Sequence, residues 1–551
     1  MKAAEYIARI LKSEGVKFVT CFPPNRLINP SAEAGIRTIL TRQERVAVNI
    51  ADGYSRVSGQ PGVALVAAGV GVENAFSGLS QAYSDFVPIL LIADQLETSV
   101  LGSRPEQDFD ALFTLHKVTK WAERINRPDR VSEFMRRAYT YLRSGRPSPV
   151  FLELPEDVAG SEVDEAKMDY RPVKGWRSGG DPRDVEVAVR ALANSKNPLL
   201  YAGEGAYYAG AWDELLELAE LLNIPVMTTL KAKGVFPEDH PLSVGVGGRT
   251  GSKVAAYFMK KADLILSIGA SLTRGSPNLL IGAPVPRGKI IIQSTIDEYD
   301  INKDYIADYV IIGDAKLVLR QLIEEAKRQK VGSRLAQKIR DEIRAAKDEW
   351  LKEWMPKLTS NEVPINPYRV VWDLIHTIDS RNATVTHDAG CPRDQLASFY
   401  QAPIPRGYLG WGHHSTLGYS LGGAMGAKLA KPERTVVNLM GDAAFGMVGI
   451  DFETAVREKI PILTILLNNS GMGTYFKATP STSTLSGDYS KIAEALGGYT
   501  EKIERPDEIA PAIKRAEKST KSGKAALLEI VSAVDVNFQT KYWTELKTSL
   551  A

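Results

Sequence analysis

Short runs of apolar residues, bounded by glycine or proline, alternate along the chain with segments of helical periodicity. In the first part of the chain these runs are 62–68 (GVALVAA), 87–93 (VPILLIA) and 149–153 (PVFLE). Runs that are apolar throughout are typical of strands buried on both faces of a parallel sheet, and the helical segments between them would supply the crossover connections. The pattern therefore predicts an α/β domain over residues 1–165.

The same alternation returns twice. A stretch at 160–185 that gathers glycine, proline and charge predicts a linker. A second block covers 184–328, with strands expected at 198–202, 225–228, 262–268 and 289–293. A third block covers 365–551, with strands expected at 384–386, 435–440, 461–467 and 525–531. We therefore expect three doubly wound α/β domains, of which the first and third share a strand spacing but no residue-level repeat.

Residues 313–356, between the second and third blocks, are rich in Lys, Glu, Arg and Ala. This composition predicts a helical segment that connects two domains. Its charged positions are expected to form a solvated face rather than a binding site.

Composition excludes several classes of protein. The 551 residues are 44% hydrophobic and 24% charged, which is typical of globular chains rather than disordered ones. The net charge is 68 − 66 = +2, so a nucleic-acid partner is not expected. No apolar run reaches the roughly 18 residues that a membrane-spanning helix needs, so no membrane partner is expected. The two cysteines, Cys21 and Cys391, cannot staple a chain of this size, and we expect a reducing, cytoplasmic compartment.

Two polar motifs follow neighbouring apolar runs of the third block. Gly441 and Asp442 come directly after TVVNLM, and Asn469 comes just after PILTILL, 469 − 442 = 27 residues later. That is the length of one strand–helix–strand unit, so the carboxylate and the amide oxygen are expected side by side at the carboxyl ends of adjacent strands. Both are hard oxygen ligands suited to Mg²⁺. Taken singly, Asp442 could cap a helix and the two asparagines could form an ordinary turn.

The GDAA and NNSG segments resemble the metal–diphosphate motif of thiamine diphosphate enzymes. The whole chain is similar to the superfamily of acetolactate synthase, pyruvate oxidase and benzoylformate decarboxylase, in the order pyrimidine-binding, central and diphosphate-binding domain. The resemblance implies that Asp442, Asn469 and the carbonyl of Gly471 bind Mg²⁺. It also implies further cofactor contacts at Pro24, Gly71, Asn74, Asp388, Gly390, Gly441, Ala443, Ala444, Asn469, Gly471 and Met472.

The first block supplies the matching half of such a site. Residues 41–45 (TRQER) and 51–56 (ADGYSR) resemble the family's R-x-E…ADGYAR stretch. Glu44 would follow a strand at 37–41 and open a helix, where its carboxyl group can be held away from water. A carboxyl group in an apolar site keeps its proton more readily and can share it with N1′ of the aminopyrimidine. Without the resemblance, Glu44 would be interpreted as a first-turn carboxylate stabilised by the helix dipole.

Residues 413–418 (HHSTLG) precede a glycine-rich segment that we expect to be helical. Leu417, within them, lies 442 − 417 = 25 residues before Asp442. By resemblance, Leu417 would wedge the cofactor into its bent form and the Ser415 carbonyl would accept a hydrogen bond from the 4′-amino group. Leu417 could otherwise be a core leucine.

Four further residues are expected near the reacting carbonyl. His413, His414 and His116 are plausible proton carriers, although a histidine pair before a helix could equally be structural. Gln107 matches the family's glutamine near the reaction centre.

The chain departs from acetolactate synthases at two places. Residues 22–25 (FPPN) replace the family's YPGG loop, so Pro23 and Pro24 would make a different wall for the substrate. Residues 468–477 (NNSGMGTYFK) lack the tryptophan that those enzymes carry after the two asparagines.

The central block resembles the family domain that binds FAD, ADP or nothing. Several residues lie at expected strand ends where they could contact a nucleotide, although each could also be an ordinary turn residue. These are Gly203, Gly205, Gly248, Arg249, Arg274 and Asp297.

The sequence therefore predicts an enzyme that uses thiamine diphosphate and Mg²⁺, with FAD as an open question, to act on a 2-oxo acid. The leading expectation is the acetolactate synthase reaction, in which two pyruvates give 2-acetolactate and CO₂. One alternative is a decarboxylase or lyase acting on another 2-oxo acid or a 2-hydroxyacyl donor, and another is an inactive protein that only binds a flavin or nucleotide. The resemblance also implies a homodimer at least, and a homotetramer as the leading case, because the pyrimidine-binding domain of one family subunit faces the diphosphate-binding domain of another.

Overall fold

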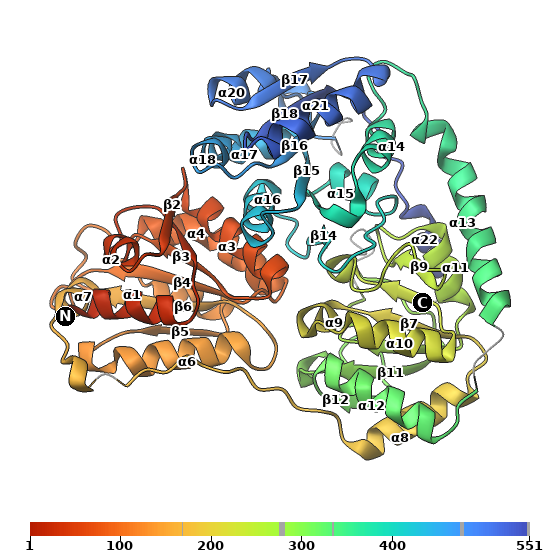
Figure 1. The fold of residues 1–551 in the computed structure, drawn as a ribbon, viewed down its shortest axis with the longest axis horizontal. Coiled ribbons are helices and arrows are strands. Elements are labelled where there is room, and N and C mark those ends of the chain that lie inside the picture. Colours follow the sequence, from red (N-terminus) through yellow and green to blue (C-terminus); the bar gives the residue numbers. More distant parts are fainter. Residues whose placement is uncertain (168, 275–281, 333–335, 474–478, 548–551) are drawn as a thin grey trace.

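Three six-stranded sheets, each covered by helices, make up the computed structural model of the protein (Figure 1). The structure describes residues 1–167, 169–274, 282–332, 336–473 and 479–547. All named strand pairs in the three sheets are parallel. The expectation of three doubly wound α/β domains is thus confirmed. No helix among the described residues is both long and apolar enough to span a membrane.

The first sheet has the strand order β2-β1-β3-β4-β6-β5. Its strands are β1 Phe18–Cys21, β2 Arg37–Leu40, β3 Gly62–Val66, β4 Ile89–Gln95, β5 Trp121–Arg124 and β6 Val150–Pro155. The main helices that cover it are α1 Ala3–Ser13, α3 Glu44–Ser58, α4 Val70–Ser84 and α6 Val131–Arg143. Strands β3 and β4 are buried along their whole length, as expected for central parallel strands.

The central sheet has the order β12-β11-β10-β7-β8-β9. Its strands are β7 Pro198–Ala202, β8 Val226–Thr228, β9 Ser243–Val246, β10 Leu264–Ile268, β11 Ile290–Thr295 and β12 Tyr309–Ile312. The main helices are α8 Pro182–Asn194, α10 Trp212–Leu222, α11 Lys253–Lys261 and α12 Ala315–Arg328. The order reverses between β10 and β7, which is the point where open α/β sheets bind ligands.

The third sheet has the order β14-β13-β15-β16-β18-β17, the same as the first when strands are counted along each domain. Its strands are β13 Ala383–His387, β14 Tyr408–Leu409, β15 Thr435–Gly441, β16 Leu463–Asn468, β17 Tyr499–Ile503 and β18 Ala526–Val531. The main helices are α14 Pro367–Thr377, α15 Cys391–Leu396, α16 Tyr419–Ala430, α17 Asp442–Val448, α20 Tyr489–Ala495 and α21 Ile509–Lys521.

One expectation about the charged segment 313–356 is wrong. Its first part, α12, packs against the central sheet and buries Val318, Leu319 and Leu322, so it belongs to that domain's core rather than forming a connector. The second part is the 23-residue helix α13 Ala336–Leu358, which runs beside the central and third domains (Figure 1). It is not simply solvated, because Trp350 and Trp354 are buried. Eleven of the 23 residues of α13 are charged, and they concealed an apolar stripe of helical spacing.

The first and third domains meet through two helices, α3 and α16. Glycines allow their backbones to approach closely: a Cβ on Gly53 would lie 2.2 Å from the carbonyl oxygen of Gly423, and one on Gly426 would lie 2.2 Å from that of Ile50. In this single chain, the first domain therefore docks on the third domain of the same polypeptide.

The C-terminal segment returns to the central domain (Figure 1). Helix α22 Lys541–Lys547 lies against α11, and the Trp543 indole donates a hydrogen bond to the Gly251 carbonyl at 2.7 Å. The side chain of Trp543 is fully buried. The end of the third domain thus fastens the central domain to it.

Candidate active site

Glu44 is the first residue of α3 and is only 4% exposed. Asn74, in the first turns of α4, donates a hydrogen bond from Nδ2 to Glu44 Oε2 at 3.1 Å. Among the described residues, Asn74 is the only hydrogen-bond partner of this carboxyl group. A dry carboxyl group with one oxygen fixed and the other available can exchange a proton with a ring nitrogen.

Asp442 and Asn469 lie at the ends of neighbouring strands, because Gly441 of β15 pairs with Leu467 of β16. The Gly471 N–H lies 3.1 Å from Asp442 Oδ2 and 3.1 Å from Asn469 Oδ1, so the carboxylate and amide oxygens converge on one point. Burial raises the pKa of Asp442 above its ordinary value, whereas the N–H groups of Ala443 and Gly471 oppose that rise.

These oxygens fit a magnesium ion that also takes phosphate oxygens and water. Mg²⁺ is usually held by one or two protein carboxylates together with substrate phosphates. Within the described ranges, no three His, Cys, Asp or Glu side chains gather into a metal site of their own. The donor set around Asp442 therefore suits a metal that arrives with a diphosphate.

Glu529, which the sequence analysis did not identify, orients the loop that begins at Asn468. Glu529 of β18 is fully buried, and its Oε1 accepts a hydrogen bond from Asn468 Nδ2 at 2.7 Å. Its other oxygen accepts one from the Ser490 N–H at 2.6 Å. Asn468 is thus a structural asparagine, which leaves Asn469 to face the Asp442 side. A charged residue inside the apolar run AALLEIV was the available signal.

Asp388 lies directly after β13, but both oxygens of its carboxylate are already engaged. It accepts hydrogen bonds from the backbone N–H groups of Ala389, Gly418 and Ser420 at 2.8, 3.0 and 3.1 Å, and from the Ser420 hydroxyl. Asp388 is fully buried. Its side chain therefore holds the turn that starts α16 rather than pointing to a ligand.

Residues 415–418 lie directly before α16, and their backbone geometry is unusual. Ser415 has φ of +56°, and its hydroxyl accepts a hydrogen bond from Arg393 at 2.8 Å. Leu417 is half-buried and packs against a cluster that contains residues of both the first and the third domain. The position of Leu417 is compatible with a side chain that supports a bent ligand. The wedge role itself stays a prediction.

His413, His414 and His116 lie in three different environments. The Nδ1 atom of His414 lies 3.0 Å from the hydroxyl of Ser80 in α4. The pKa of His413 is lowered, chiefly by loss of solvation and next by the Lys231 ammonium. His116 lies on an exposed one-turn helix. His413 and His414 therefore lie where the first and third domains meet, and their catalytic role stays a prediction.

A buried ionic network also joins these two domains, and sequence reasoning did not single it out. Arg56 donates hydrogen bonds to Asp52 at 2.6 Å and to Asp85 at 3.0 Å. Asp52 accepts one from the Tyr419 hydroxyl, and Asp85 accepts one from the His413 N–H at 3.3 Å. The sequence did contain a signal for this network, because Asp52 and Arg56 of the ADGYSR segment carry opposite charges four residues apart.

Gln107 and Pro24 both lie close to the carboxyl ends of first-domain strands. Gln107 has φ of +66°, and its carbonyl oxygen would lie 2.8 Å from a Cβ on Gly69, so the 69–74 loop needs glycine there. Pro24 is exposed, and the next residue, Asn25, ties the loop down by donating to the Val66 carbonyl at 2.7 Å.

The remaining cofactor candidates lie on backbone that can approach a ligand closely. Gly390 has φ of +80° and a Cβ there would meet no atom within 4 Å. Gly71, Gly441, Ala443 and Ala444 belong to first turns or strand ends that follow β3 and β15. Met472 donates its N–H to the Ser483 carbonyl at 2.9 Å. Residues 474–477 of the NNSGMGTYFK segment lie outside the described residues.

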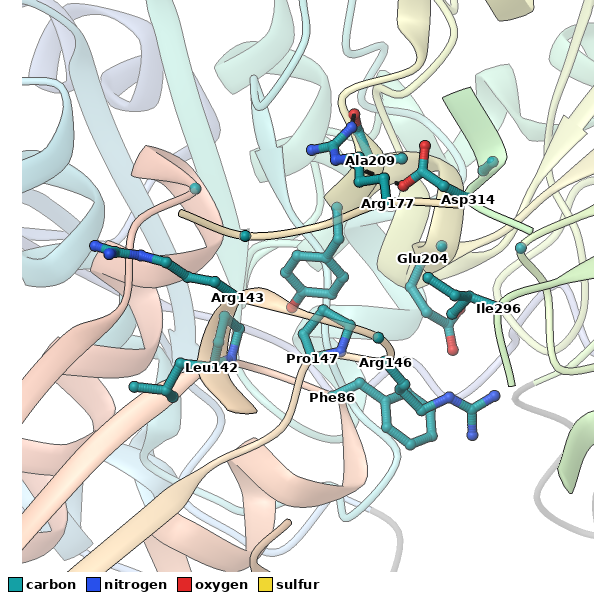
Figure 2. A pocket seen from close by; sticks show the side chains of 18 of the residues that line it. Phe86, Leu142, Arg143, Arg146, Pro147, Arg177, Glu204, Ala209, Ile296 and Asp314 are labelled. Atoms are coloured by element: carbon teal, nitrogen blue, oxygen red, sulfur yellow. Dashed lines mark hydrogen bonds and ion pairs between the residues drawn. The ribbon is translucent and has the colours of Figure 1, made fainter. Parts of the chain in front are cut away.

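A cavity of about 340 Å³ lies between the first and central domains (Figure 2). Arg146 and Phe86 line it from the first domain, and the Arg146 guanidinium lies 4.3 Å from the centre of the Phe86 ring. Glu204 and Asp314 line it from the central domain. The cavity therefore offers cationic, anionic and aromatic groups together.

Only some of the residues considered for binding a flavin or nucleotide line this cavity. Gly205 lines the cavity of Figure 2, and a Cβ on Gly203 would lie 2.3 Å from Ala270 Cα. Asp297 is held by Arg146 at 3.0 Å, and Arg249 is held by Asp394 at 2.8 Å. Two other candidates lie apart from the cavity lining, namely Gly248 and Arg274.

A buried acid in the first domain and converging carboxylate and amide oxygens at adjacent strand ends of the third are features of a coenzyme-dependent α/β enzyme. Three family models match the chain in the same order. They are the N-terminal TPP binding domain over residues 1–113, the central domain over 185–322 and the C-terminal TPP binding domain over 388–530 of thiamine pyrophosphate enzymes.

Curated relatives match almost the whole chain. The probable acetolactate synthase large subunit of Methanocaldococcus jannaschii is 34% identical, over 96% of this chain and 92% of the relative. That of Methanococcus aeolicus is 31% identical over 94% and 90%, and the acetolactate synthase isozyme 3 large subunit of Escherichia coli is 28% identical over 96% and 94%. The chain belongs to the thiamine pyrophosphate enzyme family, in the superfamily of acetolactate synthase and pyruvate oxidase.

Proposed function

We propose that the protein is an acetolactate synthase-like carboligase that uses thiamine diphosphate and Mg²⁺ to join two 2-oxo acid units with loss of CO₂. The proposal is supported by a buried Glu44 and by the converging oxygens of Asp442 and Asn469, in a chain similar to acetolactate synthase large subunits over nearly its full length. Pyruvate is the proposed donor and acceptor.

Glu44 would hold a proton at N1′ of the aminopyrimidine. Its side chain is buried in the wall made by α3, and Asn74 fixes one of its oxygens. When bound, thiamine diphosphate supplies a nucleophilic thiazolium carbon and a ring that accepts the electrons left by decarboxylation. The protein's part is to hold and move the proton that makes this carbon reactive.

Asp442, Asn469 and the Gly471 carbonyl would hold the metal. Their oxygens lie at the ends of β15 and β16, beside the start of α17, and would hold the metal together with the diphosphate. His413, whose lowered pKa keeps it neutral near pH 7, is a proposed proton acceptor for the substrate, with His414 and Gln107 as neighbours.

The test of this assignment is Glu44→Gln. The amide keeps the shape and the hydrogen bond to Asn74 but cannot give or take a proton. We expect turnover with pyruvate to fall by at least about 100-fold, while thiamine diphosphate affinity, measured by tryptophan fluorescence, changes by less than a factor of about five. Exchange of the cofactor C2 proton, followed by NMR, should stop. Unchanged turnover would refute the role.

Product analysis separates the carboligase from its rivals. Purified protein with pyruvate should give acetolactate, whereas acetaldehyde would indicate the decarboxylase alternative. The Pro23 and Pro24 pair motivates that alternative, because it replaces two glycines in the loop at the end of β1. Neither product would point to another donor, and failure to bind thiamine diphosphate would point to an inactive flavin- or nucleotide-binding protein.

Several further features are part of the proposal. We place the domain limits at 1–165, 184–328 and 365–551, the enzyme in the cytoplasm with its two cysteines free, and the assembly at a homodimer or homotetramer. Light scattering of the purified protein tests the assembly. FAD is proposed only as an occupant to be tested in the cavity of Figure 2, where a visible absorbance band of the purified protein decides the matter.

A further inference from the structure

A cavity of about 450 Å³ lies away from the site described above, against β9, the edge strand of the central sheet. Helix α13, helix α14 and the segment 398–401 form its other walls. Figure 1 shows α13 running past β9 and α11 on the outer side of the molecule. The volume is in the range of ligand sites for small molecules.

Charged groups that are seldom buried form the floor of this cavity. Lys233 is 2% exposed and Glu238 is 4% exposed, and the two form an ion pair. Glu238 Oε2 also accepts a hydrogen bond from the Ala402 N–H at 2.8 Å. Within the described part of the chain, Glu238 Oε1 is buried and has no hydrogen-bond partner. Leaving such an acceptor unsatisfied costs about 1–3 kcal/mol, so this oxygen requires a donor that the protein does not supply.

Two further polar groups of the cavity wall are also open to a ligand. The hydroxyl of Tyr400 is buried without a hydrogen-bond partner among the described residues. The ammonium group of Lys347, on α13, has no ion-pair or hydrogen-bond partner in the same described ranges, and burial lowers its pKa. The carboxylates whose charge acts on Lys347 are those of Glu238 and Asp239, and Asp239 is engaged by Arg381.

The apolar part of the cavity is largely aromatic. Trp350 and Phe399 stack with ring centres 5.0 Å apart, and Trp372 of α14 also lines the cavity. An aromatic ring placed among these side chains would gain about 0.5–1.5 kcal/mol beyond the burial of its area.

We propose that this cavity binds a small aromatic carboxylic acid with a hydrogen-bond donor on the adjacent carbon, which is an aromatic 2-amino or 2-hydroxy acid. Lys347 receives the carboxylate, the free oxygen of Glu238 accepts from the amino or hydroxyl group, and the ring lies against Trp350 and Phe399. The proposal is independent of the thiamine diphosphate site, because none of its residues belongs to that site.

Calorimetry on the full chain tests this with three probes that share one carbon skeleton: L-phenylalanine, L-3-phenyllactate and 3-phenylpropanoate. At least one of the first two should bind at least about tenfold more tightly than the third, since only they carry the donor that Glu238 needs. The comparison between them distinguishes an amino acid from a hydroxy acid. No binding of any probe at 10 mM, or equal binding of all three, overturns the proposal and leaves ordered water as the occupant.

Variants identify the site. Lys347→Met should weaken binding by at least about tenfold, whereas Lys352→Met, an exposed lysine of the same helix outside the cavity, should leave it unchanged. Tyr400→Phe removes only a hydroxyl and should weaken binding without loss of fold, as checked by the thermal midpoint. Normal binding by Lys347→Met overturns the assignment. Acetolactate formation without ligand should be the same in all variants, so failure here is distinguishable from failure of the proposed function.

Discussion

Single polar atoms decide what the candidate site can do. Glu44 keeps one oxygen for a ligand because only Asn74 bonds to its side chain among the described residues, whereas Asp388 has both oxygens occupied by backbone and hydroxyl donors. Two buried carboxylates that look equivalent in the sequence thus have different uses. Glu44 leaves one oxygen without a hydrogen-bond partner among the described residues, and Asp388 fixes the turn that starts α16.

The metal assignment can be checked at Asp442. Asp442→Asn removes one negative charge while it keeps the size of the side chain and one oxygen. Because ligand charge tunes the affinity of a hard cation, we expect the Mg²⁺ concentration for half-maximal activity to rise by at least about tenfold. Asp507→Asn, at an exposed carboxylate that does not lie at the ends of β15 or β16, is the matched control and should not change this concentration. An unchanged Mg²⁺ requirement in Asp442→Asn would contradict the assignment.

Asp451 predicts a pH effect on stability. Its Oδ1 accepts the Arg42 N–H at 2.8 Å, its Oδ2 is buried without a partner among the described residues, and burial raises its pKa to about 6. A folded pKa above the unfolded value means that the stabilising contribution is complete below about pH 4 and is lost as the pH rises through about 6. The wild type should therefore gain about 1 kcal/mol between pH 7.5 and pH 5 from this group alone.

The measurement is the urea midpoint at both pH values. Asp451→Asn should lack this gain, whereas Asp181→Asn, at an exposed helix cap whose pKa is about 2, should retain it. If the pH dependence of Asp451→Asn matches that of the wild type, the carboxyl group is not the source.

At the scale of elements, the contact between α3 and α16 is the one that joins the first domain to the third. Four glycines make it, Gly53 from α3 and Gly422, Gly423 and Gly426 from α16. Gly422 and Gly423 have side-chain atoms of the facing or same helix within 3 Å of an added Cβ, so the helices pack without any spare space.

Gly53→Ala should separate these helices. The new methyl group would lie 2.2 Å from a backbone oxygen that cannot move without its helix, so we expect a loss of at least about 2 kcal/mol in stability and a fall in cofactor affinity. Gly160→Ala ends another helix where an added Cβ meets no atom within 4 Å, and it should be neutral or slightly stabilising. Thermal midpoints and thiamine diphosphate binding measure both. Equal effects from the two substitutions would show that the close approach is not needed.

Central strands were predictable from the sequence, whereas several edge strands were not. Runs such as 62–68 and 435–440 were recognisable because central parallel strands are apolar on both faces. The strands that the pattern did not predict include β5 (WAER), β9 (SVGV), β14 (YL) and β17 (YTEKI), and all four lie at sheet edges. An edge strand needs no continuous apolar run, so its signal is lost among polar turns.

For the site, the sequence could indicate residues but not their contacts. Asp442 and Asn469 were predictable because adjacent parallel strands bring their ends together. The use of Asp388 as a backbone anchor and the link from Asp85 to the His413 N–H depend on chain segments far apart in sequence, which no local pattern encodes. Helix α12 was misassigned for a related reason, because its apolar stripe is visible only once the sheet it covers is known.

At the scale of the molecule, the C-terminal segment holds the third domain to the central one. The Trp350 indole donates to Gln539, the Trp354 indole donates to the Tyr542 hydroxyl at 3.0 Å, and the Trp543 indole donates to Gly251. Helix α13 and the last residues of the described chain thus form a clamp around the central domain.

Trp543→Ala should open that clamp. Truncating a fully buried tryptophan costs about 3–5 kcal/mol, and here the loss falls on the domain interface. We expect a lower thermal midpoint and faster tryptic cleavage near the 160–181 linker and the ends of α13. Trp176→Ala, where the side chain is 61% exposed, should change stability by about 0.5 kcal/mol or less. Protease resistance like that of the wild type in Trp543→Ala would argue against a clamp.

The shared strand order of the first and third sheets has a further meaning. Helix α3 connects the second and third strands of its sheet, and α16 occupies the same place in the other, so the helices that face each other are topological equivalents. Equivalent surfaces meeting face to face are the mark of an isologous homodimer, here carried inside one polypeptide.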